Sequence, residues 1–473
     1  MADLTNLSAE QLLQAIAARD LSCVELMAAC LDRIEQVNPV INAIISLRPR
    51  DELLHEAAQA DLVEHPGPLH GIPFAIKDLV ETAGIRTTHG SPIYADHVPH
   101  TDDLLAARIR SAGAIIIGKT NTPEFGLGSH SFNPVHGVTR NPYDLSKTAG
   151  GSSGGAAAAL AARLVPLADG SDTMGSLRNP AAFCNVYGFR PSFGLIPRDP
   201  VGDLFLNQIS MDGPMARNVR DIALLLDVLA GPTPWDPHAL PAQPSFLIGL
   251  DRPTRAKRIG WIGNWNGHLP TEPGVLELCE TALKTFDELG IQVEPIVPPF
   301  DPNRLWESWL VLRSFANCGS KRDLYDDPAK RALLKPEMIY EIEAGMAVTA
   351  SQVHAASVVR SEWFATAGEL FQTYDALVLP SAQLFPFDAE IRWPQSITGR
   401  AMSTYHQWME VVIPASIAGL PAISVPAGFS PNGLPMGMQL IGARNTDLEL
   451  LRLAEAYHRS TDFPGRYPPH LAL

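Results

Sequence analysis

Residues 147–183, KTAGGSSGGAAAALAARLVPLADGSDTMGSLRNPAAF, decide how this chain is interpreted. They contain two clusters rich in glycine and serine, residues 150–155 and 170–176, separated by an alanine-rich run. Glycine permits positive φ and lets a ligand approach main-chain N–H groups, so a serine among glycines is exposed for chemistry. The alanines favour a helix, and the apolar residues 164–168 favour a short buried strand. One helix and one strand would therefore hold both serine clusters in one place.

Length and composition set the broad class of the protein. The chain has 473 residues, of which 46% are hydrophobic and 18% charged, so it can form a large core and is not expected to be disordered. The formal net charge of −15 disfavours binding to nucleic acid or to an anionic membrane. Five cysteines without a C-x-x-C pair argue against a disulfide framework or a zinc site. Because neither a membrane span nor a signal-like N-terminus is evident, we expect a cytoplasmic protein.

Hydrophobic periodicity predicts alternating helices and strands. Two amphipathic helices should open the chain within residues 3–37, with Ser22 capping the second. Further helices are expected at residues 52–63, 101–112, 220–230, 275–289, 304–372 (mostly helical) and 446–458, and strands at residues 40–47, 114–117, 259–262, 292–296 and 375–380. The proline-rich residues 231–258 are expected to form an irregular connection. This alternation predicts one continuing α/β sheet rather than the start of a second domain.

Lys77 is a charged residue in the apolar segment PFAIKDLV, residues 73–80. A buried, unpaired ammonium group is costly, so such a lysine pairs with an acid, extends to solvent or loses its proton. From position alone, pairing with Asp78 or extension to solvent is the ordinary interpretation. A neutral amine that serves as a base is the functional alternative.

Two short segments match the residue patterns of known motifs, but the secondary structure predicted around them does not fit those motifs. Residues 113–120, GAIIIGKT, fit the phosphate-loop pattern, but a predicted helix precedes them and isoleucines fill the would-be loop. Residues 151–155, GSSGG, fit the nucleophile elbow of α/β-hydrolases with Ser153 at the centre. Residues 141–149 are polar and contain Pro142, so we expect no strand before that serine. Neither nucleotide binding nor an α/β-hydrolase site is therefore expected.

An ordered set of segments resembles the amidase signature family. Besides Lys77 and the two serine clusters, the set comprises GKTNTPEF, TRNPY, GFRPS, AGLPAISVP and GLPMGMQ at residues 118–125, 139–143, 188–192, 418–426 and 433–439. The resemblance is close over residues 9–220 and good over residues 374–458. It implies an α/β fold with a central mixed, twisted β-sheet surrounded by helices. It also implies a single amidase domain over residues 1–473, with a catalytic signature core at residues 66–220. We interpret the largely helical residues 300–400 as a variable lid or pocket wall.

The resemblance implies a catalytic lysine and two serines at matching positions. Ser176 would be the nucleophile that forms an acyl-enzyme, Ser152 the bridging serine that takes its proton, and Lys77 the base behind both. Taken singly, Ser152 could be a helix cap and Ser176 a turn residue, but their combination with Lys77 favours catalysis. The chemistry is sound without histidine, because desolvation lowers the pKa of a lysine and a neutral amine can accept a serine proton. That proton can return through Ser152 to the leaving amine.

Further site residues surround this unit. The resemblance implies an oxyanion hole formed by the backbone N–H groups of Thr173, Met174, Gly175 and Ser176. It implies supporting side chains at Ser153, Asp172 and Arg178. It also implies that Phe125 and Gly126 bind the substrate. An ordinary surface ion pair is the alternative for Asp172 and Arg178. Many members have glycine where Met174 stands. A side chain there should intrude on the acyl side of the site, so Met174→Gly is expected to change substrate preference more than stability.

The sequence thus predicts hydrolysis of a small-molecule carboxylic amide to acid and amine, without a metal or cofactor. No nucleic-acid or membrane partner is expected, and a homodimer is compatible with the sequence. Three alternatives stay open. The first is the glutamine-hydrolysing subunit of a tRNA-dependent amidotransferase, which would need partner chains. The second is an aryl-acylamidase or carbamate hydrolase on the same fold. The third is an inactive binding protein, against which the intact lysine and serines argue.

Overall fold

The centre of the molecule is a large β-sheet. The computed structural model describes residues 3–206, 208–461, 463–466, 468 and 471, and within them the sheet has 11 strands. In spatial order these are β1 (Ile44–Ile45), β3 (Ile115–Thr120), β2 (Pro73–Lys77), β8 (Leu167–Asp172), β10 (Met211–Ala216), β9 (Tyr187–Arg190), β16 (Ala422–Phe429), β17 (Pro435–Ile441), β13 (Ala376–Pro380), β11 (Arg258–Trp261) and β12 (Gln292–Pro295). Strands β3, β2 and β8 run parallel, as do β13, β11 and β12, and the remaining neighbours are antiparallel. The predicted α/β fold with a mixed sheet is therefore confirmed.

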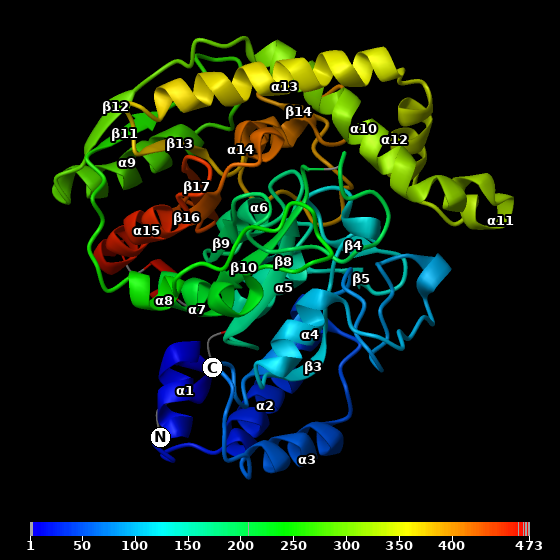
Figure 1. Cartoon of the computed structure of the whole chain (residues 1–473), viewed down its shortest axis with the longest axis vertical. Helices are drawn as coiled ribbons and strands as arrows, with labels where there is room; N and C mark the ends of the chain where they lie inside the picture. Colours follow the sequence, from blue (N-terminus) through cyan, green and yellow to red (C-terminus); the bar gives the residue numbers. More distant parts are fainter. Residues whose placement is uncertain (1–2, 207, 462, 467, 469–470, 472–473) are drawn as a thin grey trace.

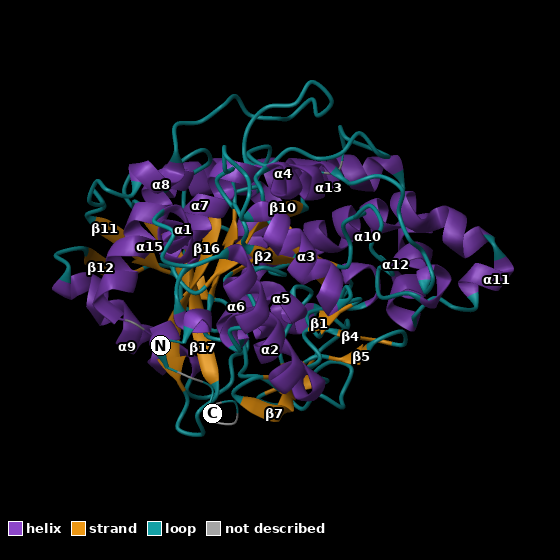
Figure 2. Ribbon diagram, turned by 90° about the horizontal axis from the view of Figure 1, so that it is seen from below, coloured by secondary structure: helices purple, strands orange, loops and turns teal. Residues whose placement is uncertain are grey.

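Helices lie on both sides of this sheet (Figures 1 and 2). They are α1 (Ala9–Ala17), α2 (Cys23–Ile41), α3 (Arg50–Ala60), α4 (Leu104–Ser111), α5 (Gly154–Ala161), α6 (Arg178–Phe183), α7 (Val219–Leu229), α8 (Phe246–Gly249), α9 (Val275–Glu288), α10 (Pro302–Asp326), α11 (Pro328–Arg331), α12 (Pro336–Met346), α13 (Ala350–Leu370), α14 (Ile413–Ala418) and α15 (Asp447–Thr461). In Figure 2, α5 and α6 lie on the opposite side of the strands from α7 and α8. Within the described residues, no helix has the length and apolar character needed to cross a bilayer.

Several shorter elements lie outside the central sheet and its helices. Small two-stranded sheets pair β4 (Phe132–Asn133) with β5 (Gly137–Val138), β6 (Arg140–Asn141) with β7 (Asp144–Thr148), and β14 (Ser396–Ile397) with β15 (Arg400–Ala401). Short 3₁₀ turns are η1 (Leu4–Asn6), η2 (Pro92–Tyr94), η3 (Glu124–Gly126), η4 (Gln407–Val412) and η5 (Phe463–Gly465).

The pattern that resembles a phosphate loop is strand β3. Ile115 and Ile117 belong to one apolar core and Ile116 to the other, as expected when successive side chains point to opposite faces of a sheet. Lys119 is fully buried in the same strand, and its Nζ donates to Thr82 Oγ1 at 2.8 Å. The segment is therefore sheet core, and the expectation that it does not form a phosphate loop is confirmed.

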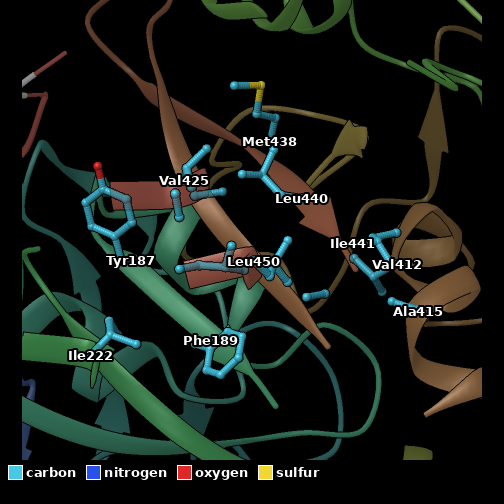
Figure 3. Close-up of a cluster of buried hydrophobic side chains, with 14 of the residues drawn as sticks. Tyr187, Phe189, Ile222, Val412, Ala415, Val425, Met438, Leu440, Ile441 and Leu450 are labelled. Atoms are coloured by element: carbon cyan, nitrogen blue, oxygen red, sulfur yellow. The ribbon is translucent and has the colours of Figure 1, made fainter. Parts of the chain in front are cut away.

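The larger apolar core lies around strands β9, β16 and β17. Tyr187 and Phe189 from β9, Val425 from β16 and Met438 from β17 meet there (Figure 3), and all four are fully buried. Close packing of this kind gives low compressibility, so the sheet offers a rigid support for loops at its strand ends.

Some predicted boundaries are wrong. Helix α2 continues past Pro39 and ends at Asn42, whose left-handed φ of 51° stops it, so only Ile44–Ile45 form a strand where residues 40–47 were expected. Strand β7 precedes Ser153, contrary to expectation, although it pairs with β6 outside the central sheet. Helix α8 interrupts the connection at residues 231–258. Residues 300–400 contain the predicted strand β13, and the short hairpin of β14 and β15 at their end was not expected.

Candidate active site

Lys77 ends strand β2, which lies between β3 and β8 in the sheet, and is 1% exposed. Its Nζ lies within hydrogen-bond distance of three hydroxyl oxygens: 2.9 Å from Ser152 Oγ, 2.8 Å from Ser153 Oγ and 2.9 Å from Ser171 Oγ. In the described part of the chain Lys77 forms no ion pair, and Asp78 instead accepts the N–H of Thr88 at 3.0 Å. The two ordinary interpretations, pairing with Asp78 and extension to solvent, are therefore wrong.

The environment of Lys77 suits a group that gains and loses a proton. Burial lowers the pKa of Lys77 to about 8, although the negative charges of Asp169, Asp212 and Asp172 act in the opposite direction. A neutral amine has two donors and one lone pair, and an ammonium group has three donors. Three surrounding hydroxyls can satisfy either form, since a hydroxyl both donates and accepts.

The first serine cluster leads into helix α5. Ser153 is the residue that precedes the first turn, and the peptide bond between Gly151 and Ser152 is cis. At Gly155 a Cβ would lie 2.3 Å from the backbone nitrogen of Asn121, so only glycine fits where the helix meets that segment. The N–H of Ser153 donates to the carbonyl of Ser176 at 3.2 Å. This bond joins the first cluster to the second.

The second serine cluster lies at the end of strand β8. The strand begins at Leu167, after Pro166, and includes Ser171 and Asp172, so the strand predicted at residues 164–168 is displaced toward the C-terminus. Proline lacks the N–H that a central strand needs, which explains why pairing begins after it. Residues 170–172 of the cluster therefore belong to the strand, and residues 173–176 form the loop that carries Ser176.

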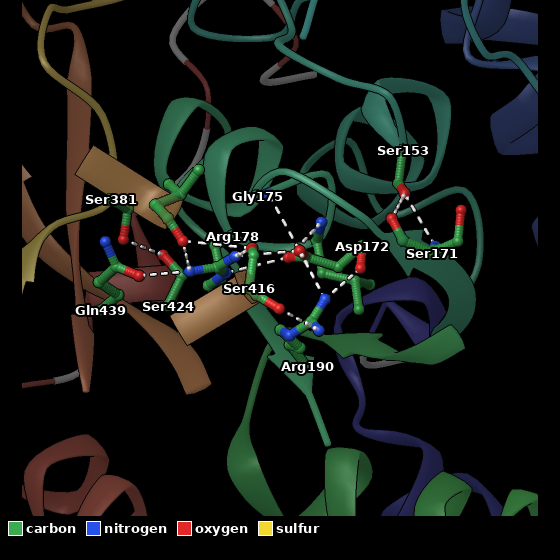
Figure 4. Close-up of polar contacts among 12 residues, drawn as sticks. Ser153, Ser171, Asp172, Gly175, Arg178, Arg190, Ser381, Ser416, Ser424 and Gln439 are labelled. Atoms are coloured by element: carbon green, nitrogen blue, oxygen red, sulfur yellow. Dashed lines mark hydrogen bonds and ion pairs between the residues drawn. The ribbon is translucent and has the colours of Figure 1, made fainter. Parts of the chain in front are cut away.

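Beneath that loop lies a buried ionic network (Figure 4). Asp172 is fully buried and accepts from Arg178 Nε at 3.0 Å, from Arg178 Nη2 at 3.0 Å and from Arg190 Nη1 at 3.2 Å. Burial by itself raises the pKa of Asp172, but the two guanidinium groups outweigh it and hold this pKa well below its usual range. The predicted pairing of Asp172 with Arg178 is therefore present as a buried network, not as a surface ion pair.

This network fixes the loop from both ends. Asp172 accepts the N–H of Gly175 at 2.9 Å, and Arg178 donates to the carbonyl of Val412 at 3.0 Å and to Ser416 Oγ at 2.7 Å. No role was predicted from the sequence for Arg190 or Ser171. For Arg190 a signal was present, because an arginine in the otherwise apolar strand YGFR needs a buried partner.

The backbone of the Ser176 loop presents several free donors. Gly175 has a φ of 76°, and a Cβ there would lie 2.8 Å from Val412 Cγ1. Its N–H is engaged by Asp172, which differs from the role expected for it in an oxyanion hole. Among the described residues, the N–H groups of Thr173, Met174 and Ser176 find no backbone acceptor, and the hydroxyl of Ser176 forms no hydrogen bond. The direct link from Ser152 to Ser176 is therefore not formed in this structure.

A family model described as Amidase matches residues 25–451. The chain belongs to the amidase signature family. Membership confirms the resemblance inferred from the ordered segments and the enzyme class that it implied. Among similar proteins, a glutamyl-tRNA(Gln) amidotransferase subunit from Thermus thermophilus is 37% identical, over 94% of this chain and 95% of that protein. An acylamidase of Rhodococcus erythropolis is 35% identical, over 98% of this chain and 97% of that protein.

Solved structures give the same result. The structure of a bacterial aryl acylamidase of the amidase signature family superposes with a TM-score of 0.89 and 30% identity, covering 97% of this chain and 99% of that one. Agreement over nearly the whole length extends the likeness beyond the signature core to the helices at residues 300–400.

Of the expected substrate-binding pair of this amidase, Gly126 lies beside Ser152. A Cβ on Gly126, whose φ is 71°, would lie 3.5 Å from Ser152 Oγ. Phe125 precedes it with a φ of 50°, and its N–H donates to the carbonyl of His89 at 2.8 Å. The Lys321 amine lies 5.2 Å from the centre of the Phe125 ring. This loop therefore forms one wall next to Ser152.

Met174 is buried. Its side chain is 2% exposed and belongs to the larger apolar core, so its truncation should cost stability. Because Ser152 and Ser176 are buried as well, the intrusion of Met174 on the acyl side of the site stays a prediction.

We expect Met174→Ala to lower the free energy of unfolding by about 2–5 kcal/mol, because the truncated side chain leaves a cavity. Urea denaturation measures this change. Met346, which is 47% exposed, offers a matched control, since Met346→Ala removes the same atoms without opening a cavity. Equal midpoints for the unaltered protein and Met174→Ala would contradict the prediction.

Proposed function

We propose that this amidase hydrolyses a carboxylic amide to acid and amine through an acyl-enzyme on Ser176, with Ser152 and Lys77 as the proton relay. The observation that carries the proposal is the 2.9 Å contact between Lys77 Nζ and Ser152 Oγ, in a site where burial lowers the pKa of Lys77 to about 8. A serine hydroxyl needs such an acceptor to become a nucleophile.

The proposed reaction moves one proton in a circuit. Ser176 Oγ attacks the amide carbonyl carbon, its proton passes to Ser152, and the Ser152 proton passes to the neutral amine of Lys77. The C–N bond then breaks, and the proton returns through Ser152 to the leaving amine. Water attacks the resulting ester, gives a proton to the relay and releases the acid, while Ser176 regains its hydrogen.

The remaining site residues position the reacting groups. The N–H groups of Thr173, Met174 and Ser176 are the proposed oxyanion donors, each worth about 10²–10³ in rate. Ser153 and Ser171 hold the Lys77 amine at 2.8 and 2.9 Å. The buried network at Asp172 fixes the loop, so these donors need little reorganisation during the reaction.

We further propose that residues 1–473 form one amidase domain with its catalytic core at residues 66–220, and that residues 300–400 supply a pocket wall. Two contacts support that wall. Lys335 Nζ donates to the carbonyl of Leu127 at 2.6 Å, and the N–H of Lys335 donates to Glu124 Oε2 at 2.9 Å. Both acceptors flank the loop that contains Phe125 and Gly126.

An acyl or aryl-acyl amide is the substrate class that we favour, since an acylamidase and an aryl acylamidase are among the similar proteins over nearly the full length. Glutamine is the second candidate, supported by the 37% identity to an amidotransferase subunit. The test is hydrolysis of acyl anilides and of glutamine by the purified chain, first alone and then with the partner subunits of a tRNA-dependent amidotransferase. Anilide turnover supports the first candidate. Ammonia release from glutamine only with partner subunits favours the second, and no turnover of either contradicts the proposed function.

The pH dependence of the reaction follows from Lys77. Because protonated Lys77 cannot accept a proton, and burial lowers its pKa to about 8, kcat/KM should rise as pH increases through about 8. A pH profile of anilide hydrolysis from about pH 6 to about pH 10 measures this limb. A rate that peaks near pH 6 and falls at higher pH would show that a neutral lysine is not required.

A further inference from the structure

Asp212 is an acidic residue beside the proposed relay. It lies in β10 directly opposite Ser171 of β8 in the antiparallel ladder. Opposed residues of such a ladder share one face of the sheet, with Cβ atoms about 4.5–5.5 Å apart. Ser171 Oγ is in turn 2.9 Å from Lys77 Nζ. Asp212 is therefore next to the relay without belonging to it.

The Asp212 carboxylate lacks a direct partner among the described residues. It is partly buried, and in the described part of the chain it forms neither an ion pair nor a hydrogen bond. Its charged surroundings are Asp169, Asp199, Lys77 and Arg198. Lys77 is held by three serines, and Arg198 donates to the carbonyl of Leu204 at 3.3 Å. A partly desolvated carboxylate without a partner is costly, so a ligand that supplies one gains binding energy.

Other elements packed on β10 do not supply that partner. Arg190, from the neighbouring strand β9, is bound to Asp172. Helix α5 contains only glycine, alanine and leucine, and Asp221 of helix α7 accepts the N–H of Ala9 at 2.9 Å. Asp169, from β8, is a second carboxylate, and its Oδ2 is buried without a hydrogen-bond partner among the described residues.

Partly exposed residues mark where a substrate can approach. Lys77, Ser152 and Asp172 are buried, whereas neighbouring Ser171, Thr173, Ser210 and Asp212 keep part of their surface exposed. Thr173 Oγ1 donates to Ser210 Oγ at 3.0 Å, which ties the nucleophile loop to the segment that leads into β10. Of the four exposed residues only Asp212 is ionisable. A substrate that enters along this face therefore meets one unpaired negative charge.

We propose that Asp212 is a specificity residue that binds an ammonium group of the substrate, so that amides carrying a protonated amine a few bonds from the scissile carbonyl are preferred over neutral amides of the same shape. The inference rests on the proposed function and names its substrate class. The net charge of −15 acts in the same direction, because it attracts cations to the protein.

This preference should depend on pH in a defined direction. Burial raises the pKa of Asp212 to about 7, and Asp169 acts in the same direction. The carboxylate, and with it the preference for a cation, is therefore present above about pH 7 and is lost as pH falls through that value. Hydrolysis needs neutral Lys77, whose pKa is about 8, so Asp212 is ionised where the enzyme is active.

The test compares two substrates on the Asp212→Asn variant. The pair is an anilide whose acyl chain ends in an ammonium group and an anilide whose chain of equal length ends in a methyl group. A charge-assisted hydrogen bond corresponds to a factor of about 10–100, so kcat/KM for the ammonium substrate should fall about tenfold or more, and that for the neutral substrate should fall less than about threefold. The ratio of the two values is the readout, because any change in the pKa of Lys77 affects both substrates equally.

Two further variants serve as controls for the Asp212→Asn comparison. Asp212→Glu keeps the carboxylate and should keep most of the preference. Asp287→Asn makes the same change in net charge at an exposed position of helix α9 and should leave the ratio unchanged. Equal losses on both substrates with Asp212→Asn, or no loss on either, would overturn the inference. If the Asp212→Asn variant is active and its ratio of the two kcat/KM values is unchanged, only this inference is contradicted. If the unaltered protein hydrolyses neither substrate, the proposed function is contradicted as well.

Discussion

Replacing Ser176 by alanine should reduce kcat for amide hydrolysis by about 10⁵-fold or more while the protein stays folded, since removal of a serine nucleophile abolishes the covalent step. The fold should tolerate the change because the side chain is small and its hydroxyl forms no hydrogen bond within the described residues. Steady-state kinetics on an acyl anilide, combined with a urea denaturation curve, separates the two effects.

Ser129 supplies the control for this experiment. Its hydroxyl is likewise buried without a hydrogen-bond partner among the described residues, so Ser129→Ala removes a comparable group that the proposed reaction does not use. Turnover by Ser176→Ala within about tenfold of the unaltered rate would remove Ser176 from the mechanism.

Replacing Lys77 by methionine should lower kcat/KM by about 10²–10⁴-fold, the usual contribution of a positioned base. Methionine keeps the length and apolar stem of the side chain, so the loss reports the missing amine. The loss should be greatest above about pH 8, where the unaltered lysine is neutral. Below that value the two proteins should converge, because protonated Lys77 is no base either.

Lys119 is a matched control for Lys77. It lies in the adjacent strand β3, is fully buried, and burial lowers its pKa to about 8 as well. Its Nζ donates to Thr82 Oγ1 and contacts none of the three serines around Lys77. Lys119→Met should therefore affect stability rather than the proton relay. Loss of activity by only about twofold or threefold in Lys77→Met would assign that lysine a structural role.

The residues that local sequence could identify are those whose spacing fixes their position. The alanines after Ser153 specify helix α5, and the short distance along the chain from Asp172 to Arg178 keeps that pair together in one loop. Lys77 was identifiable because a lysine in an apolar strand needs an explanation. Each of these inferences uses one segment and its neighbours.

The residues that escaped prediction depend on how distant segments pair. Ser171 reaches Lys77 only because β2 lies beside β8, and Asp212 faces Ser171 only because β10 aligns with β8 in that register. A shift by one residue would turn either side chain to the other face of the sheet. The burial of Met174 similarly depends on a core built from segments far apart in the chain.

The proposed reaction requires Ser176 to be the nucleophile of a relay that ends at Lys77. Labelling of the active protein with a fluorophosphonate, followed by mass spectrometry of the modified peptide, reads out both residues in one experiment. We expect one phosphonyl group on Ser176, and its absence from the Lys77→Met variant over the same time. A label on Ser152 or Ser153 instead, or labelling of Ser176 at an undiminished rate without Lys77, would rule out this relay.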